Sequence, residues 1–292
     1  MNDKAKTIAV IKTYISKMPS LPIAWSKIQD ISKNPKATPA DLNQVINLDP
    51  VLMGRVMKLI NSAYYGMNNQ ITSLVRAIIM LGVNTVKNLA LSTAVLGGLS
   101  SKSNFLALNN DGFWRHSLCV GVAAKLIATK RRKDPKQLEE YFVSGLLHDI
   151  GKIPLNNKLS AEYVQALSLT DKEHLPLYIA EERTMEVNHC EVGRLIVNNW
   201  NLGSAMEDVV FFHHFLDSYP GENRDVLLTV AAANYFANSY QIGFSGDRYP
   251  EPLPSSVFEE LKITRDDFDE VESKVNGEIE KAKIFLQVAA RQ

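Results

Sequence analysis

The sequence has little cysteine, no excess of charge of either sign and no long apolar run. Its 292 residues include two cysteines, Cys119 and Cys190, without CxxC spacing, which excludes a disulfide framework and predicts two small buried side chains. The 32 basic and 32 acidic residues balance, so no basic field favours binding to nucleic acid or a membrane surface. No apolar run approaches the roughly 20 residues that span a bilayer, and Met1 to Val10 lack a signal-peptide pattern. We therefore expect a cytoplasmic globular protein.

The alternation of apolar and polar residues that is typical of strands is also missing. Apolar residues recur instead at spacings of three and four, in segments joined by short turns. This pattern predicts an all-α multi-helix bundle without a repeat of fixed period. The polar stretch 99–111 is the best boundary. We therefore expect an N-terminal helical subdomain at 1–110, a second helical subdomain at 111–242, and a loop with a C-terminal helix at 243–292.

The predicted C-terminal helix begins after Thr264 and carries one apolar stripe, made by Phe268, Val271, Val275, Ala282 and Phe285. The simpler interpretation is that this stripe packs back on the core of its own chain. The alternative is a dimerisation helix, which would make the protein a homodimer, although Gly277 weakens any long coiled coil.

An imidazole and a carboxylate, His148 and Asp149, stand at the end of the apolar run 142–147. Gly151 follows, and we expect it to stop the helix and Pro154 to prevent its resumption. Burying an unpaired charge is costly, so both side chains should bind a metal, accept or donate hydrogen bonds, or form ion pairs.

All six histidines follow residue 115, and several stand where the helical pattern calls for an apolar side chain. His116, His189, His213 and Asn234 each point inward from a different predicted helix, whereas His174 lies outside the pattern and should be exposed. A single buried histidine is usually a satisfied core residue. Several in one half of a helical chain favour a convergent polar centre of the kind that holds metal in bundles.

Hydrolysis of a phosphate ester is the reaction that suits such a centre. A divalent ion held by histidine and aspartate lowers the pKa of bound water and neutralises charge on phosphoryl oxygens. Lys152 lies just beyond the predicted helix end, where it could reach a phosphate. The ordinary alternative for Lys152 is a solvated surface charge.

At these residues the sequence resembles the HD superfamily of metal-dependent phosphohydrolases. The doublet His148-Asp149 corresponds to the motif that names the superfamily, His116 to its leading histidine, and His213-His214 to its later pair. The run from His148 to Lys152 is especially similar to the cyclic-di-GMP phosphodiesterase branch called HD-GYP.

The first half of the chain narrows the resemblance to the HDOD family, the HD-related output domain of bacterial signalling proteins. The similarity covers about residues 18–240. The motifs follow one another in the family's order: Leu21-Pro22, Leu48-Asp49-Pro50, Asn61 to Gly66, Ala77-Ile78, Leu81-Gly82, Phe113 to Ser117, Gly145 to Lys152, and His189 to Gly193.

The resemblance implies a set of metal ligands and a catalytic pair. The implied ligands are His116, His148, Asp149, one or both of His213 and His214, His189 at a second position, and the position of Asn234. Asp149 and Lys152 would serve catalysis, with Lys152 orienting the phosphate. The implied cofactor is a divalent ion, with Fe, Mn, Mg, Ni and Zn all compatible with the ligand types.

Two departures separate this chain from catalytic relatives. Asn234 stands where they carry an aspartate, and an amide is neutral and a weaker ligand. Phe215 follows the paired histidines, and only Tyr219-Pro220 remains of the Gly-Tyr-Pro signature. We therefore do not expect cyclic-di-GMP hydrolysis.

Two functions remain open. The favoured one is a regulatory signalling module, non-catalytic or weakly catalytic, that receives its input from a signalling protein or a small nucleotide ligand. In that interpretation the N-terminal helices, including 61–66, face the partner, although 61–66 could equally be helix-end packing around Tyr64 and Tyr65. The alternative is a metal-dependent phosphohydrolase acting on a nucleotide or another phosphomonoester.

Overall fold

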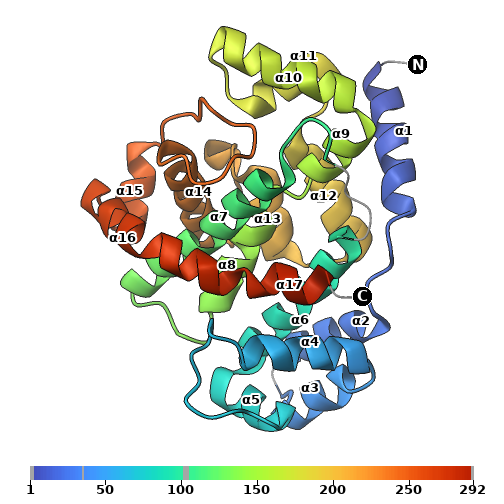
Figure 1. The fold of residues 1–292 in the computed structure, drawn as a ribbon, viewed down its shortest axis with the longest axis vertical. Helices are drawn as coiled ribbons and strands as arrows, with labels where there is room; N and C mark the ends of the chain where they lie inside the picture. Colours follow the sequence, from blue (N-terminus) through green and yellow to red (C-terminus); the bar gives the residue numbers. More distant parts are fainter. Residues whose placement is uncertain (1–2, 35, 101–104, 291–292) are drawn as a thin grey trace.

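The computed structural model describes residues 3–34, 36–100 and 105–290, and over these ranges the chain is helical with no strand (Figure 1). The first helices are α1 (Asp3–Ser16), α2 (Ile23–Lys33), α3 (Pro39–Ile46), α4 (Pro50–Ile60), α5 (Leu74–Leu81) and α6 (Val83–Ser100). The middle of the chain forms α7 (Asn110–Lys130), α8 (Leu138–Leu147), α9 (Lys152–Lys158), α10 (Ser160–Glu173), α11 (Leu177–Met185) and α12 (His189–Trp200). The last are α13 (Ser204–Phe212), the short 3-10 helix η1 (Leu216–Ser218), α14 (Arg224–Ser239), α15 (Ser255–Leu261), α16 (Arg265–Ala282) and α17 (Ile284–Ala290). The expected all-α fold is confirmed.

Side-chain caps set several of these helix starts. Thr38 and Asp41 form a reciprocal capping box at α3, with Pro39 in the first helical position. Asp49 accepts a hydrogen bond from the Leu52 N–H at the start of α4. These caps satisfy N–H groups that have no partner within the helix, so short helices can follow one another through tight turns.

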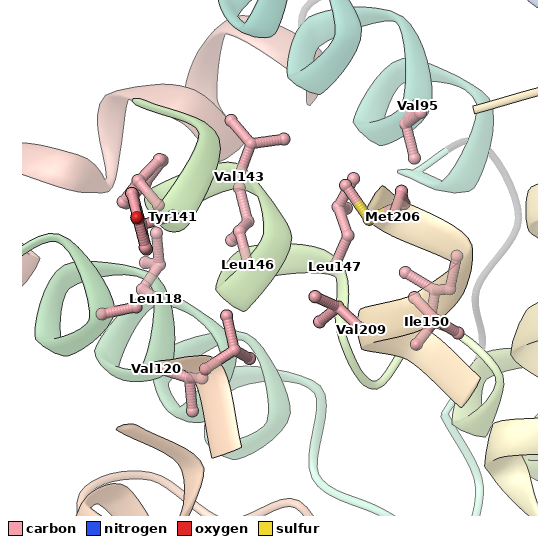
Figure 2. Packing of buried hydrophobic residues seen from close by; sticks show 14 of the residues in the cluster. Val95, Leu118, Val120, Tyr141, Val143, Leu146, Leu147, Ile150, Met206 and Val209 are labelled. Carbon is pink, nitrogen blue, oxygen red and sulfur yellow. The ribbon is translucent and has the colours of Figure 1, made fainter. Parts of the chain in front are cut away.

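The helices α7 and α8 form the centre of the molecule, with α14 and α16 packed on α7 and with α6 on α8 (Figure 1). Figure 2 shows the apolar side chains of α8 between Leu118 and Val120 of α7 and Met206 and Val209 of α13. This core fixes the end of α8, where the His148-Asp149 doublet follows.

The apolar stripe of the C-terminal segment is buried inside its own chain. Phe268, Val271 and Val275 lie on α16, which packs on α7, while Phe285 lies on α17, which packs on α4 and α6. The packing interpretation is therefore confirmed, and this stripe is not free to form a dimer interface. A homodimer remains a prediction that would need another surface.

The segment 61–66 also packs within the chain. Asn61 donates to the Ile71 carbonyl and accepts from the Ile71 N–H. Tyr64 is half-buried, lies with its ring 5.0 Å from that of Phe285, and accepts a hydrogen bond from Lys125. Of the two interpretations, helix-end packing is the one that these contacts support.

Several further expectations have clear outcomes. Cys119 and Cys190 are buried free thiols, and His174 is exposed, as predicted. The prediction that Pro154 prevents a helix from resuming after Gly151 is wrong, because α9 begins at Lys152 and runs through Pro154. Proline fits there since the N–H groups of a first helical turn have no partner within the helix.

The boundary expected at 99–111 falls partly on 101–104, outside the described residues, so the subdomain division stays a prediction. Over the described part of the chain, no single helix is long and apolar enough to cross a membrane. The pair Leu74–Leu81 and Val83–Leu99 meets the length and composition requirement only together, with a bend of 117° between them.

Candidate metal centre

Five helices and one turn bring the predicted site residues together. His148 and Asp149 lie in the turn between α8 and α9. The other members come from the start of α9, the start of α12, the end of α13, and the interiors of α7 and α14: Lys152, His189, His213, His214, His116 and Asn234. All except His214 are at least 94% buried, and His214 is half-buried.

Close backbone approaches position the His148-Asp149 turn. A Cβ atom on Gly151 would lie 2.5 Å from the backbone N of Gly193 and closer still to the backbone O of His189. Glycine at this position therefore lets the turn touch the first turn of α12. The φ of Gly151 is −65°, so the residue is required by space rather than by a left-handed conformation.

Asp149 lies between two groups of histidines, with one carboxylate oxygen toward each. Its Oδ2 lies 3.3 Å from His148 Nε2 and 3.8 Å from His116 Nε2. Its Oδ1 lies 3.3 Å from His189 Nε2 and 3.7 Å from His213 Nε2. A single carboxylate thus joins the two halves of the centre.

The second nitrogen of three histidine rings is held from behind. His148 Nδ1 lies 2.7 Å from the Gly145 carbonyl, and His213 Nδ1 lies 3.0 Å from the Val209 carbonyl. His189 Nδ1 lies 2.6 Å from Glu181 Oε2. A proton on each Nδ1 satisfies these acceptors and leaves each Nε2 unprotonated toward Asp149, which is the arrangement of a metal-binding imidazole.

Burial controls the protonation of the imidazoles. It lowers the pKa of His116 to about 3 and that of His189 and His214 well below the ordinary value, while Asp149 acts in the opposite direction on each. The pKa of His213 is lowered for the same reason. These four rings are therefore neutral at physiological pH, as ligands must be.

Asp149 and Lys152 form a buried ion pair. Lys152 Nζ donates to Asp149 Oδ2 over 2.7 Å. Burial raises the pKa of Asp149, but attraction to His148 and Lys152 lowers it by more. The pKa of Asp149 is therefore well below its ordinary value. Burial lowers the pKa of Lys152, but Asp149, Glu181 and Asp247 raise it more. Both groups are charged, and Lys152 is not the solvated surface lysine that the sequence left as its alternative.

The donor set fits a divalent ion. His116 Nε2, His148 Nε2 and Asp149 Oδ1 are buried polar atoms without a hydrogen-bond partner, and all face the same centre. Unpaired buried polar atoms are rare and indicate a ligand or ion. The donor atoms form two sets, and within each set they lie no more than 4.8 Å from one another. One set is on His116, His148 and Asp149, and the other is on His189, His213 and His214.

Asn234 lies beside His116 and accepts a hydrogen bond from Asn238 at its Oδ1. It contributes an amide, without charge, to the half of the centre that contains His116. The imidazole of His214 stacks on Tyr178, with ring centroids 4.9 Å apart.

An open pocket leads to the centre. It has a volume of about 320 Å³ and is lined by the buried His213 and Asn234, the half-buried His214 and the proline-rich loop 250–254. Its ionisable lining residues other than histidine and tyrosine are Asp217 and Glu251, both exposed.

Sequence reasoning missed three buried polar residues around the centre. Glu181 holds His189 through its ring and its backbone N–H, Ser245 accepts from Lys152 over 3.3 Å, and Asp247 accepts from the Leu177 N–H. Burial raises the pKa of Glu181 to about 8 and that of Asp247 to about 6, although Lys152 lowers both. Glu181 stands in a Glu-Glu doublet that reads as surface, and Ser245 and Asp247 lie in a loop without periodicity.

Solved structures share this fold. An HDOD domain protein of Geobacter sulfurreducens aligns with a TM-score of 0.71 and 24% identity over 97% of each chain. A "Putative signal transduction protein" of Marinobacter aquaeolei VT8 aligns with a TM-score of 0.73 and 18% identity, over 97% of this chain and 66% of that one. A "Putative phosphohydrolase" of Shewanella amazonensis SB2B gives 0.68 and 20% over 95% and 98%. Identities this low show the fold alone.

A sequence relative extends beyond this chain. An uncharacterized protein of Treponema pallidum (strain Nichols) is 26% identical over 258 residues, which is 88% of this chain and 48% of that protein. The chain therefore spans about half the length of this relative. The sequence pattern of the HDOD domain matches residues 18–216, ending before the residue 240 expected from the motifs. Because this match covers more than half of the chain, the protein belongs to the HDOD family.

Proposed function

We propose that the chain is a regulatory signalling module whose metal-capable centre is charge-balanced by its own residues and contributes little or no catalysis. The observation that carries this proposal is that Asp149 is the one carboxylate among the implied ligands, since Asn234 places an uncharged amide beside His116. Asp149 is the carboxylate that faces both histidine groups, and a buried ammonium already neutralises it.

Charge is what a hydrolytic centre with two divalent ions requires. Two such ions carry four positive charges, which bundle enzymes balance with several carboxylates. Here one carboxylate is paired with Lys152, and Asn234 supplies an uncharged amide beside His116. Neutral imidazoles complete the set. This composition supports weak metal binding rather than a tightly held dinuclear centre.

The approach to the centre is also unfavourable for a phosphate ester. Asp217 and Glu251 line the pocket, and its described lining contains neither lysine nor arginine. Tyr178 donates a hydrogen bond to Glu251, which holds that carboxylate in the lining of the pocket. A phosphate dianion would meet negative charge before it reached the histidines.

When a divalent ion is bound, His116, His148, Asp149, His189, His213 and His214 are the residues that would hold it. The ion would then supply an acidified water and charge neutralisation for a phosphoryl group. Glu181 fixes the ring of His189, and Lys152 holds Asp149 in place through its 2.7 Å hydrogen bond. Lys152 is buried on Asp149, so it would have to leave that carboxylate to contact a substrate.

We propose that the N-terminal helices form the surface for a signalling partner. Leu48 at the end of α3, Val51 on α4 and Ile79 and Met80 on α5 are between 51% and 64% exposed. These three helices pack on one another. Exposed apolar side chains on packed neighbouring helices are typical of protein-binding surfaces. We assign the partner interaction, with a cytoplasmic signalling protein, to this region.

Metal analysis with an activity screen tests the proposal. The purified protein is analysed for bound metal and then assayed against phosphomonoesters, phosphodiesters and nucleotides, with Mn, Mg, Fe, Ni or Zn added. We expect turnover no higher than that of the His148→Ala variant. Turnover that His148→Ala abolishes, together with tightly bound metal, would overturn the proposal.

A phosphohydrolase remains the second candidate because of one observation. The Nε2 atoms of His116 and His148 are buried without hydrogen-bond partners, as they would be in an enzyme prepared to bind an ion. The same activity screen decides between the two functions. Turnover would be expected with a small phosphomonoester first, because the pocket volume of about 320 Å³ limits larger substrates.

A further inference from the structure

A second pocket lies where the N-terminal helices meet the rest of the chain. It has a volume of about 310 Å³, and its lining comes from α2, α6, α8, the start of α13 and the residue before α14. None of the described residues that line it belongs to the metal centre. A molecule bound in this pocket would therefore contact both parts of the chain without contacting the histidines.

Asn88 of α6 brings an unpaired amide to this pocket. The residue is 5% exposed, lines the pocket, and its Nδ2 is a buried donor without a hydrogen-bond partner. A buried N–H donor without an acceptor is costly and indicates a ligand. The amide of Gln29, in the same lining, is paired with Asn201 on both sides: Nε2 donates to the Asn201 carbonyl, and Oε1 accepts from Asn201 Nδ2 over 2.9 Å. Of these two amides, only that of Asn88 is left for a ligand.

The start of α13 adds backbone donors to the same pocket. The residue before the helix is Gly203, which has no side chain to accept from the first turn. The first N–H to bond inside the helix is that of Glu207, to the Gly203 carbonyl. The residues whose N–H groups precede this bond are Ser204, Ala205 and Met206, and all three line the pocket. Such N–H groups and the helix dipole favour an anion.

The remaining lining indicates what kind of anion fits. Its charged residues are Lys87 and Glu140, both half-buried. The ammonium of Lys87 suits a phosphate. Glu140 can only accept hydrogen bonds, so the rest of the ligand should offer donors, as the hydroxyls of a ribose do. Trp25, Leu91 and Leu202 supply apolar wall, which suits a base.

We propose that this pocket binds the phosphate group of a small ligand, with Lys87, Asn88 Nδ2 and the N–H groups at the start of α13 as its donors. The volume lies at the lower end of the range for small-molecule pockets, about 300 to 1,000 Å³, and favours a nucleoside monophosphate over free phosphate. His213 and His214 follow the other end of α13, so the ligand would be an input to the regulatory module. The inference rests on the proposed function for that role, but not for the binding itself.

Calorimetric titration without metal tests the binding. The full chain is titrated in EDTA, so that no ion can join a phosphate to the histidines, with AMP, GMP, adenosine, guanosine and inorganic phosphate in separate runs. We expect AMP or GMP to bind at least about tenfold more tightly than its nucleoside, because the nucleoside lacks the charge-assisted hydrogen bonds of the phosphate. The monophosphate should also bind more tightly than inorganic phosphate.

Two variants locate the binding in this pocket. Lys87→Met should weaken it at least about tenfold, since the positive charge is lost. Asn88→Leu should weaken it too, while the unliganded protein stays as stable as the wild type or becomes more stable, because an unpaired buried donor is removed. If Asn88→Leu does not fold, Asn88→Asp, whose carboxylate repels a phosphate, carries the same expectation for binding. Lys58→Met, at an exposed position on α4 outside the pocket, should bind as the wild type does.

Three results would overturn the inference: no binding of any of these compounds at millimolar concentration, nucleosides that bind as tightly as their monophosphates, or wild-type affinity in both the Lys87 and the Asn88 variants. Equal affinity for AMP and inorganic phosphate, lost in the variants, would support the site with free phosphate as its ligand. Turnover in the activity screen would overturn the regulatory function and leave the phosphate site unaffected.

Discussion

The two halves of the molecule bury different kinds of polar side chain. Among the described residues up to 100, the buried polar groups are all uncharged: Gln29, Thr85, Asn88, Ser92 and Thr93. Where the structure describes burial, every buried histidine, lysine and carboxylate lies after residue 115. In contrast, of the eight large apolar side chains found exposed in the described part of the chain, six lie before residue 101: Val10, Ile23, Leu48, Val51, Ile79 and Met80.

The buried polar groups of the two halves also differ in where their partners lie. In α6 the buried hydroxyls of Ser92 and Thr93 donate to carbonyls three residues earlier, so these two polar groups are satisfied within their own helix. In the second half the buried groups depend on one another across α7, α9, α12 and α13, as at Asp149. Changes in the buried core of the first half should therefore affect stability without affecting metal affinity, and changes at the buried polar groups of the second half should affect both.

Gly151→Ala should have the largest effect, because it acts on the backbone contact that builds the centre. The new Cβ would meet the backbone of His189 and Gly193, which cannot move as a flexible side chain would. We expect a loss of at least about 5 kcal/mol in the free energy of unfolding, or failure to fold. Urea unfolding measures this loss.

Gly277→Ala is the matched control for that substitution. Gly277 lies inside α16, and a Cβ there would meet nothing within 4 Å. Alanine should therefore stabilise the helix by about 0.5 to 1 kcal/mol. If both alanine variants unfolded at the urea concentration of the wild type, the close approach at Gly151 would not be structurally required.

Leu59→Ala should remove about 3 to 4 kcal/mol from the free energy of unfolding. Leu59 lies on α4, is fully buried and belongs to the apolar core of the first half, so its truncation leaves a cavity. At temperatures where the variant is folded, its Mn²⁺ affinity should equal that of the wild type. A loss of metal affinity as large as that of His189→Ala would break the separation between the two halves.

Helical period and residue type were enough to predict the fold and the gathering of the site residues. His116, His189 and His213 interrupt apolar faces, and side chains that do so on several helices must meet in one core. The orientation of the rings could not be predicted in the same way. Glu181, which holds His189, stands next to Glu182 in a short helix, where only the tertiary contact distinguishes the buried carboxylate from its neighbour.

Lys152 shows a second limit of sequence reasoning. Its position after an expected helix stop suggested an accessible side chain. Instead, a new helix, α9, begins at Lys152, and the lysine side chain is buried in the core. The stop was inferred from Gly151 and Pro154, which usually end helices. Here glycine serves a close approach to α12, and proline occupies a first helical turn, where it costs no hydrogen bond.

Asp247→Asn should change the pH dependence of stability by about 2 to 3 kcal/mol. The pKa of Asp247 is about 6 in the folded protein, against an ordinary value of 3.8, so the folded state holds a proton that the unfolded state releases. That stabilisation is complete below pH 3.8 and is lost as the pH rises through 6. Asparagine imitates the protonated form, so the variant should gain stability over the wild type between pH 4 and pH 7.

Urea unfolding at both pH values checks this expectation, with Asp266→Asn as the control. Asp266 is exposed in the first turn of α16 and should follow the wild type at both pH values. A constant difference between Asp247→Asn and the wild type would mean that Asp247 is ionised in the folded protein throughout this range. The second half of the molecule would then carry a further buried charge.

Asn234→Asp should have the smallest effect on stability and a specific effect on metal binding. The new carboxylate would lie beside His116, in the half where Lys152 neutralises Asp149, and would partly offset that positive charge. We expect Mn²⁺ affinity to rise by about tenfold, equivalent to about 1.4 kcal/mol. Asn276→Asp, exposed on α16, should leave the affinity unchanged. Equal affinity for both variants would show that residue 234 does not face the bound ion and that only His116 and His148 define this side of the centre.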